Sequence, residues 1–125
     1  MIHGIGIDIC QISRIARLLE REGEDGPFFR RGFTERERAE AERRHDKACF
    51  YAGRFAVKEA VRKAAGFGDL RQIESLHRED GSPYVCMDSS FGEKLRESGL
   101  TVHISVSNED DYAVAFAIAE KDPSK

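Results

Sequence analysis

The stretch from Phe55 to Gly66 constrains the fold of this chain more than any other segment. Read as a helix, it gathers small apolar side chains into one narrow stripe. The stripe consists of Gly53, Val57, Ala60, Val61 and Ala64. Because such side chains are short, a neighbouring element can approach the helix backbone closely. We therefore expect a central helix packed tightly against another element, with Gly66 ending it in the left-handed conformation.

Two charged residues, Glu59 and Lys63, lie one turn apart beside this stripe. One interpretation is an ordinary surface ion pair, which stabilises a helix by only about 0.2–0.5 kcal/mol. The other is a carboxylate and an ammonium held at the edge of the core, where water is partly excluded. The stretch by itself does not separate the two.

The first residues, Ile2 to Ile9, alternate in the manner of a β-strand. One face carries Ile5, Ile7 and Ile9, and the other carries Gly4, Gly6 and Asp8. The two glycines leave bare backbone beside a carboxylate, so either a packed helix or a ligand phosphate can lie over that face. The pattern is not a dinucleotide fingerprint, because no third glycine opens the next helix. Asp8 is then either a plain strand-end residue or a functional one.

The next segment, Ile12 to Gly23, has the apolar spacing of an amphipathic helix. Its opposite face carries Arg14, Arg17 and Arg21. Three arginines on one exposed stripe either confer solubility or dock an acidic partner, with charge steering the encounter.

Between this helix and the central one we expect a linker and a short charged helix. The linker, Glu22 to Gly32, is predicted to leave Phe28 and Phe29 partly exposed. Thr34 and Glu37 have the spacing of a capping box, which predicts a helix on the surface. Asp46 is expected to cap the central helix.

The chain after Gly68 favours β structure. Strands are predicted at Gln72–His77, Tyr84–Met87, Thr101–Ser107 and Tyr112–Ala119, with a short helix at Phe91–Glu97 and turns at Asp80-Gly81 and Asn108–Asp111. The last strand alternates bulky side chains with alanines, and an alanine face suits close packing of the long helix on the sheet.

Composition narrows the class of protein. A length of 125 residues suits one domain, 1–125, and 40% apolar residues make a lean core that oligomerisation can complete. A net charge of −3 argues against a general nucleic-acid binder. No apolar run approaches the about 18 residues of a membrane span, and the start lacks signal-peptide features. Three cysteines at no metal-ligand spacing indicate reduced thiols, so we expect a cytoplasmic protein.

Four segments together resemble a known family. They are G-I-G-I-D at 4–8 with Arg14-Ile15, A-G-R-F-A-V-K-E-A-V-R-K-A-A-G at 52–66, D-G-S-P-Y at 80–84, and H-I-S-V-S-N-E-D-D-Y-A at 103–113. In this order they resemble the holo-acyl-carrier-protein synthase family, the small single-domain branch of the 4′-phosphopantetheinyl transferases. The likeness spans nearly the whole chain.

The resemblance implies a fold and an activity. The fold is α+β, with a long central helix packed on an antiparallel sheet, usually as a homotrimer with active sites between subunits. The activity transfers 4′-phosphopantetheine from coenzyme A to a serine of apo-acyl carrier protein, with Mg²⁺, and releases adenosine 3′,5′-bisphosphate in support of fatty acid biosynthesis. Such a transfer asks the protein to position the reactants and to neutralise developing charge.

The resemblance also implies roles for individual residues. Asp8 and Glu59 are expected to hold Mg²⁺, since carboxylate oxygens suit that ion, and Lys63 to lie beside the pyrophosphate. The residues expected near coenzyme A are Arg54, Lys58, Gly81, Pro83 and Asn108, of which Gly81 and Pro83 match a turn that reaches across a subunit interface. The helix of Arg14, Arg17 and Arg21 matches a docking surface for the acidic carrier protein. The sequence does not decide whether Glu59 or a water takes the serine proton.

One departure from the family pattern concerns Asn108, which stands where the family usually carries a histidine that helps to bind coenzyme A. Asparagine forms hydrogen bonds but carries no charge, so we expect weaker coenzyme A binding with the chemistry retained. The departure also keeps open an alternative function, a relative that binds coenzyme A or a carrier protein without catalysis. A purely structural interaction domain would leave the paired acids without a purpose.

Overall fold

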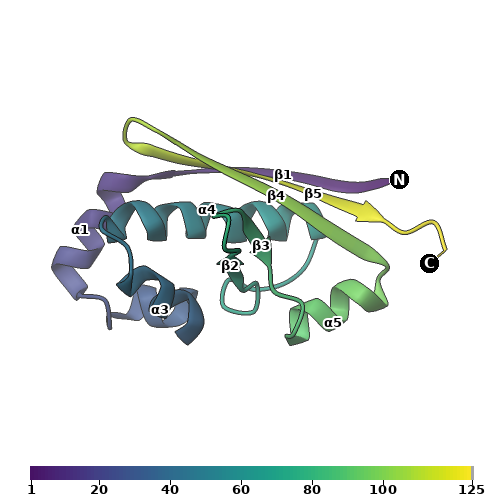
Figure 1. The fold of residues 1–125 in the computed structure, drawn as a ribbon, viewed down its shortest axis with the longest axis horizontal. Coiled ribbons are helices and arrows are strands. Elements are labelled where there is room, and N and C mark those ends of the chain that lie inside the picture. Colours follow the sequence, from purple (N-terminus) through teal and green to yellow (C-terminus); the bar gives the residue numbers. More distant parts are fainter. Residues whose placement is uncertain (125) are drawn as a thin grey trace.

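A computed structural model describes residues 1–124 of the chain. One antiparallel sheet, in the order β1–β5–β4, is formed by β1 (Ile2–Gln11), β5 (Tyr112–Lys121) and β4 (Leu100–Glu109). The long helix α4 (Lys47–Ala65) runs along one face of this sheet, and the smaller elements lie beyond α4 (Figure 1). This arrangement confirms the predicted α+β fold with a long central helix on an antiparallel sheet.

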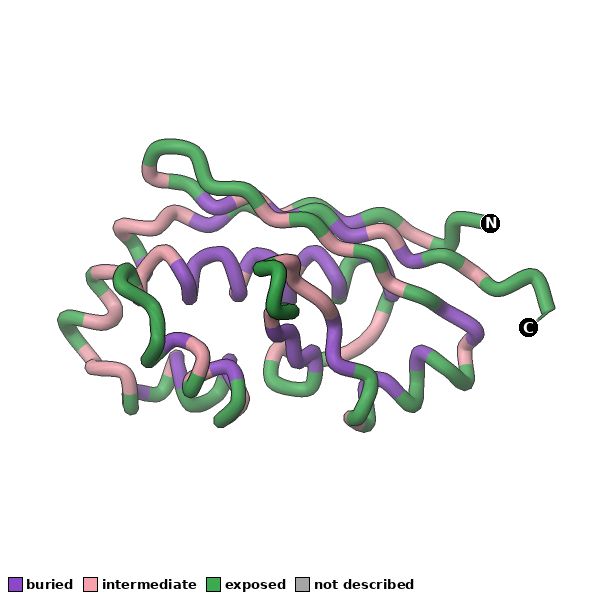
Figure 2. The backbone as a smooth tube through the Cα atoms, viewed as in Figure 1, coloured by how far each residue is buried: buried purple, intermediate pink, exposed green. Residues whose placement is uncertain are grey.

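The smaller elements form the third layer. They are α1 (Ile12–Glu22), α2 (Pro27–Gly32), α3 (Glu35–Glu42), β2 (Ser75–His77), β3 (Pro83–Val85) and α5 (Ser90–Glu97). Strands β2 and β3 pair with each other as a separate antiparallel hairpin. Helix α4 is therefore covered on two sides, and most of its length is buried in the middle of the molecule (Figure 2). No helix within residues 1–124 is long and apolar enough to span a membrane.

The glycines of β1 let α4 lie directly on that strand. A Cβ atom added at Gly6 would stand 1.9 Å from the Ala60 carbonyl oxygen, and one at Gly4 would stand 2.1 Å from that of Ala64. Both contacts are with backbone, which cannot turn aside as a flexible side chain does. Of the two occupants that the glycine face allowed, a packed helix is the one observed.

The alanines of β5 serve the same purpose on the middle strand. Ala113, Ala115, Ala117 and Ala119 are all buried, as the alternation predicted. The opposite face of the sheet is open to solvent and carries Ile5, Ile7, Ile9, Tyr112 and Phe116, each at least 40% exposed. In the strand register Ile7 lies opposite Phe116, so these side chains form one continuous apolar surface.

Helix boundaries follow the capping residues of the sequence. Thr34 and Glu37 form a complete capping box at the start of α3, and the Asp46 side chain accepts a hydrogen bond from the Cys49 backbone at the start of α4. Gly66 ends α4 in the left-handed conformation, with φ of 89°. These three predictions are confirmed.

The predicted linker before α3 is wrong in its second half, because residues 23–26 form a turn but residues 27–32 form a helix. Pro27 starts the short helix α2, where its missing N–H costs nothing, and the helix buries Phe29 completely. The ring of Phe29 packs against Tyr51 of α4 and against Phe28, which alone of the two phenylalanines stays partly exposed. Phe29 is therefore a core residue where partial exposure was expected, whereas Phe28 is partly exposed as predicted.

Helix α3 lies on the surface as predicted, with one face exposed, but its inner face is buried and carries Glu37 against Lys58 of α4. The β elements also differ at their ends. Strand β2 starts only at Ser75, and β4 continues through Asn108 to Glu109, so the turn is confined to Asp110 and Asp111. Asp110 takes a positive φ of 52°, which aspartate tolerates better than most residues.

Candidate active site

The close packing of α4 on β1 brings Lys63 to Asp8. Asp8 follows Gly4 and Gly6 on the face of β1 that meets α4, and the Lys63 ammonium nitrogen lies 3.2 Å from its Oδ1. The same ammonium donates to the carbonyl oxygen of Ile7 at 3.0 Å. A strand residue and a helix residue far apart in sequence thus share one edge of the fold.

Glu59 lies one helical turn before Lys63, on the same face of α4. The side chain is 17% exposed, close to the 18% of Asp8, so both carboxylates are partly withdrawn from water. Arg62 donates to both carboxylate oxygens, at 2.8 and 2.9 Å. Asp8 and Lys63 are therefore in contact, with Glu59 one helical turn away, and the edge-of-core interpretation fits the burial of Glu59 but not Lys63, whose side chain is 51% exposed.

A pocket of about 310 Å³ lies farther toward the start of α4. It is lined by residues of the α3–α4 connection, α4, β2 and β4, namely Arg44, His45, Asp46, Cys49, Phe50, Gly53, Arg54, His77, Val106, Ser107 and Asn108. Two of the predicted coenzyme A residues, Arg54 and Asn108, meet here from separate elements. The Asn108 amide donates to the Cys49 sulfur at 3.0 Å.

Sequence reasoning missed Arg44, His45 and His77 in this pocket. The signal that could have found the first two was the run Arg43-Arg44-His45 directly before the cap Asp46. A basic run directly before a helix places cationic side chains at the start of that helix, where they can line a pocket beside it. His77 had no such signal, because only the hairpin brings it to α4.

Lys58 occupies a different environment from the other predicted coenzyme A residues. Its side chain is fully buried, and its ammonium lies 2.6 Å from Glu37 Oε1 and donates to the Leu70 carbonyl at 2.7 Å. Burial lowers the pKa of Lys58 and raises the pKa of Glu37, since each charge has lost its water. A contact between Lys58 and coenzyme A stays a prediction, and in this structure the ammonium has internal partners.

Gly81 and Pro83 lie on the β2–β3 hairpin, outside the lining of the pocket. Gly81 has a φ of 89° in the turn, and Pro83 is the first residue of β3. Their expected neighbour was a nucleotide held across a subunit interface, and that expectation stays a prediction.

The three arginines of α1 are exposed and share one surface. Arg14, Arg17 and Arg21 line a shallow hollow of about 320 Å³ together with Leu18, Glu22 and Phe28. The surface combines cations with an apolar floor, which suits an acidic protein partner.

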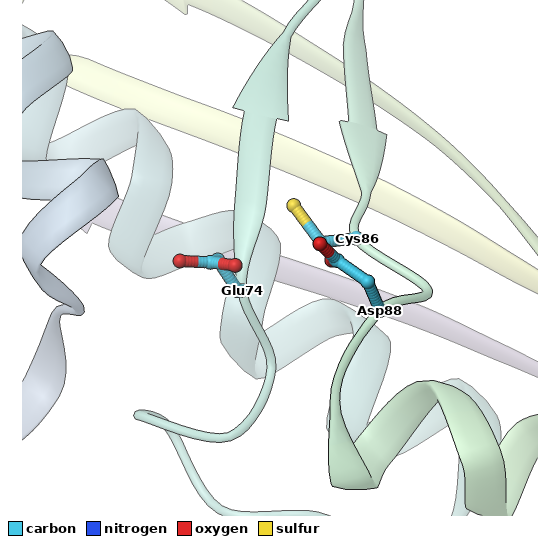
Figure 3. Close-up of side chains that lie close together, drawn as sticks. All are labelled: Glu74, Cys86 and Asp88. Atoms are coloured by element: carbon cyan, nitrogen blue, oxygen red, sulfur yellow. The ribbon is translucent and has the colours of Figure 1, made fainter.

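Another group of side chains with ligand atoms is Glu74, Cys86 and Asp88, beside the β2–β3 hairpin (Figure 3). The sequence showed no metal-ligand spacing among the three cysteines, and only the fold brings Cys86 to these two carboxylates. Arg36 forms ion pairs with both Glu74 and Asp88, so the carboxylates are already neutralised. Burial, with the Glu74 charge, raises the pKa of the Cys86 thiol to about 12, which keeps it protonated. The group therefore ties α3 to the hairpin.

Comparison with known proteins decides the family. The profile of the 4′-phosphopantetheinyl transferase superfamily matches residues 4–117. The holo-[acyl-carrier-protein] synthase of Aromatoleum aromaticum is 43% identical over 126 residues, covering 97% of this chain and 99% of that protein. The chain belongs to the holo-[acyl-carrier-protein] synthase family of 4′-phosphopantetheinyl transferases. The predicted family, and with it the class of enzyme, is confirmed.

Solved structures of this family share the fold. The holo-[acyl-carrier-protein] synthase of Neisseria meningitidis superposes with a TM-score of 0.86 at 36% identity, over 97% of this chain and 100% of that one. The enzyme from Bacillus anthracis, solved in complex with CoA (3′,5′-ADP), gives a TM-score of 0.78 at 34% identity over 98% and 99% of the two chains. The agreement at nearly full length shows that the sheet, α4 and the hairpin are features of the family.

Proposed function

We propose that this chain transfers the 4′-phosphopantetheine arm of coenzyme A to a serine of an apo-acyl carrier protein and releases adenosine 3′,5′-bisphosphate. The observation that carries the proposal is the contact between Lys63 and Asp8 at the edge of α4, one turn from Glu59. Two carboxylates and a cation at a half-buried edge are what a transfer between phosphate and hydroxyl requires. The relative from Bacillus anthracis, whose structure contains CoA (3′,5′-ADP), supports the substrate.

The pocket beside Arg54 and Asn108 is the proposed site for coenzyme A. Arg44 and Arg54 offer guanidinium groups to its phosphates, which planar arginine forks bind well. This pocket borders β4, whereas Asp8 and Lys63 lie at β1, the opposite edge of the sheet. In the proposed homotrimer, coenzyme A would therefore lie between the pocket of one subunit and the Lys63 edge of another, with its diphosphate beside the Lys63 ammonium.

Asp8 and Glu59 are the proposed holders of Mg²⁺. The residues fit the ion, because both are carboxylates, both are more than four-fifths buried, and their present partners are the solvent-accessible cations Lys63 and Arg62. When bound, Mg²⁺ would offset negative charge on the diphosphate. Lys63 would stabilise the charge that develops on the leaving phosphate, and either Glu59 or a water would accept the serine proton.

The apolar outer face of the sheet is the proposed contact between subunits of a homotrimer. Ile5, Ile7 and Ile9 are 57%, 58% and 62% exposed in the single chain, which is unusual for side chains of this kind on adjacent positions of one strand face. Burial of this face against other copies would complete the lean core. We also propose that the protein acts in the cytoplasm and that its activity supports fatty acid biosynthesis.

The carrier protein is proposed to dock on α1. The resemblance of this chain to its family implies an acidic carrier protein as the partner. Arg14, Arg17 and Arg21 present the complementary charge around an apolar hollow.

The test is a mass measurement on the carrier. Wild-type protein incubated with coenzyme A, Mg²⁺ and an apo-acyl carrier protein should add the phosphopantetheine mass, and a carrier whose acceptor serine is replaced by alanine should stay unchanged. Removal of divalent ions with EDTA should stop the addition and Mg²⁺ should restore it. Thermal stabilisation by coenzyme A without any mass change on several carriers would instead support the non-catalytic relative.

A further inference from the structure

His77 joins the coenzyme A pocket to a neighbouring hollow of about 350 Å³. It is a residue of β2, and the hairpin carries it to the start of α4. The second hollow is lined by Glu40, Arg43, Arg44, His77, Arg78 and Glu79. A histidine at this junction contacts the charged residues of the second hollow and also lines the pocket. Its protonation state therefore affects the charge in both places.

Glu40 holds His77 by two contacts. Its Oε2 accepts a hydrogen bond from the His77 backbone N–H at 3.0 Å, and its Oε1 lies 3.0 Å from the ring Nδ1. A carboxylate accepts only, so Nδ1 must carry a proton there. In a neutral ring, this tautomer leaves Nε2 as an acceptor.

The Arg54 guanidinium lies over this ring, within hydrogen-bond distance of Nε2. Its Nη2 lies 2.9 Å from Nε2 and 3.1 Å from Nδ1 of His77, while Nη1 donates to the Ser75 hydroxyl at 2.6 Å. The Arg54 side chain is almost completely buried, and its Nε has no hydrogen-bond partner among the described residues. Ser75 and His77 of β2 therefore fix the terminal nitrogens of the guanidinium.

Arg44 and Phe50 complete this wall. Arg44 Nη2 lies 3.1 Å from His77 Nδ1, and the guanidinium carbons of Arg44 and Arg54 are each 5.3 Å from the centre of the Phe50 ring. Two arginines thus converge on one aromatic ring and one imidazole. Like charges at this separation stay together only where neutral acceptors and carboxylates surround them.

We propose that His77 is a positioning residue, which as a neutral imidazole oriented by Glu40 fixes the Arg54 guanidinium in the wall of the coenzyme A pocket. The proposal rests on the proposed function, because it assigns coenzyme A to this pocket. His77 acts through Arg54 and needs no contact with the substrate.

The charges around His77 favour this neutral form. Burial lowers the pKa of His77, the nearby Arg54 and Arg44 lower it further, and the hydrogen bond to Glu40 opposes them without reversing the direction. Arg43, Arg78 and Glu79 also line the second hollow beside His77, where the arginines outnumber the glutamates. The ring is then neutral at neutral pH.

Protonation would place an Nε2–H against the Arg54 guanidinium and remove its acceptor. The coenzyme A affinity should therefore fall as the pH drops through the lowered pKa of His77, below the ordinary value of about 6.5. His45 is a second imidazole in the lining of the pocket and also contributes to its charge. Comparison of variants that share His45 removes that contribution.

The experiment compares His77→Ala, His77→Gln and the control His3→Ala with wild type. His3 lies at the other end of α4, where its Nε2 is 3.2 Å from the Ala65 carbonyl. Calorimetry gives the Kd of coenzyme A at about pH 7.5 and about pH 5.5, and the carrier assay gives KM and kcat. His77→Ala should raise Kd and KM about tenfold with kcat nearly unchanged, as expected for loss of a hydrogen bond to a buried charged group.

His77→Gln provides the conservative rescue, since its amide oxygen can accept from Arg54 and does not titrate. It should bind like wild type at the higher pH and about threefold or more tightly than wild type at the lower pH. This comparison stays decisive even if His77→Ala fails to fold.

Three results would overturn the proposal. The first is His77→Ala binding coenzyme A as well as His3→Ala does. The second is a wild-type affinity that rises on acidification while that of His77→Gln does not, which would make His77 a direct phosphate ligand. Wild-type protein that neither binds coenzyme A nor modifies a carrier would overturn the proposed function as well, whereas normal wild-type activity with unchanged variants overturns the role of His77 alone.

Discussion

Helix α4 carries two lysine–carboxylate pairs that differ chiefly in their access to water. Lys58 and Glu37 lie 2.6 Å apart with both side chains completely buried. Lys63 and Asp8 lie 3.2 Å apart with side chains 51% and 18% exposed. Both pairs join a lysine to a carboxylate and the lysines are little more than one turn apart, so burial is the main difference between a structural pair and a pair available for chemistry.

The two pairs differ because only the exposed charges can exchange their partner for water or a ligand. The buried pair has no water to replace a lost partner, and burial has already lowered the pKa of Lys58 and raised that of Glu37. The exposed pair can give up its contact to water, to a cation or to a phosphate at little cost. A site that must bind and release a substrate needs the second kind of pair.

The largest effect is expected for Lys58→Met. It should lower the free energy of unfolding by about 3–5 kcal/mol, because Glu37 is left as an unpaired buried charge. Urea denaturation at neutral pH measures this change. The double variant Lys58→Met with Glu37→Gln should regain much of the loss, since both charges are then gone. A single variant as stable as wild type would remove the distinction between the two pairs.

Glu59→Gln tests the exposed edge at nearly constant volume. Transfer to the carrier should fall by about 10²–10³-fold, as for removal of one preorganised electrostatic contact. The free energy of unfolding should change by less than about 1 kcal/mol, since Glu59 pairs with the half-exposed Arg62. Steady-state kinetics and urea denaturation of the same preparation measure both. Retained activity would refute the role of Glu59, and a large stability loss would make this edge structural.

The smallest effect is expected for Asn108→His. Asn108 is an exposed residue that contacts Cys49, so its replacement should leave the stability unchanged, as at the Lys63 edge. A histidine there adds a charge-assisted contact, which should lower the KM for coenzyme A about two- to tenfold with kcat unaltered. Kinetics with coenzyme A as the varied substrate measure this. An unchanged KM would show that Asn108 does not limit coenzyme A binding.

Local chemistry made much of the fold predictable. Capping by Thr34, Asp46 and Gly66 depends on residues within one turn, and the glycines of β1 and the alanines of β5 record close packing by their size alone. The motif around Glu59 and Lys63, with Asp8, indicated the family. The buried Phe29 was missed, because Pro27 was taken as part of a linker and a short helix shows too little periodicity.

The sequence by itself determined the strands and capped helices, the small residues where backbones meet, and the acids and lysines of the family motif. Only the tertiary structure decided that Lys58 is internal while Lys63 is exposed, and that Arg44, Arg54 and His77 share one pocket. The reason is that periodicity reports which face of a helix a residue occupies. It does not report what covers that face, and in this chain α3 and the β2–β3 hairpin cover the side of α4 that its charged residues would leave to water.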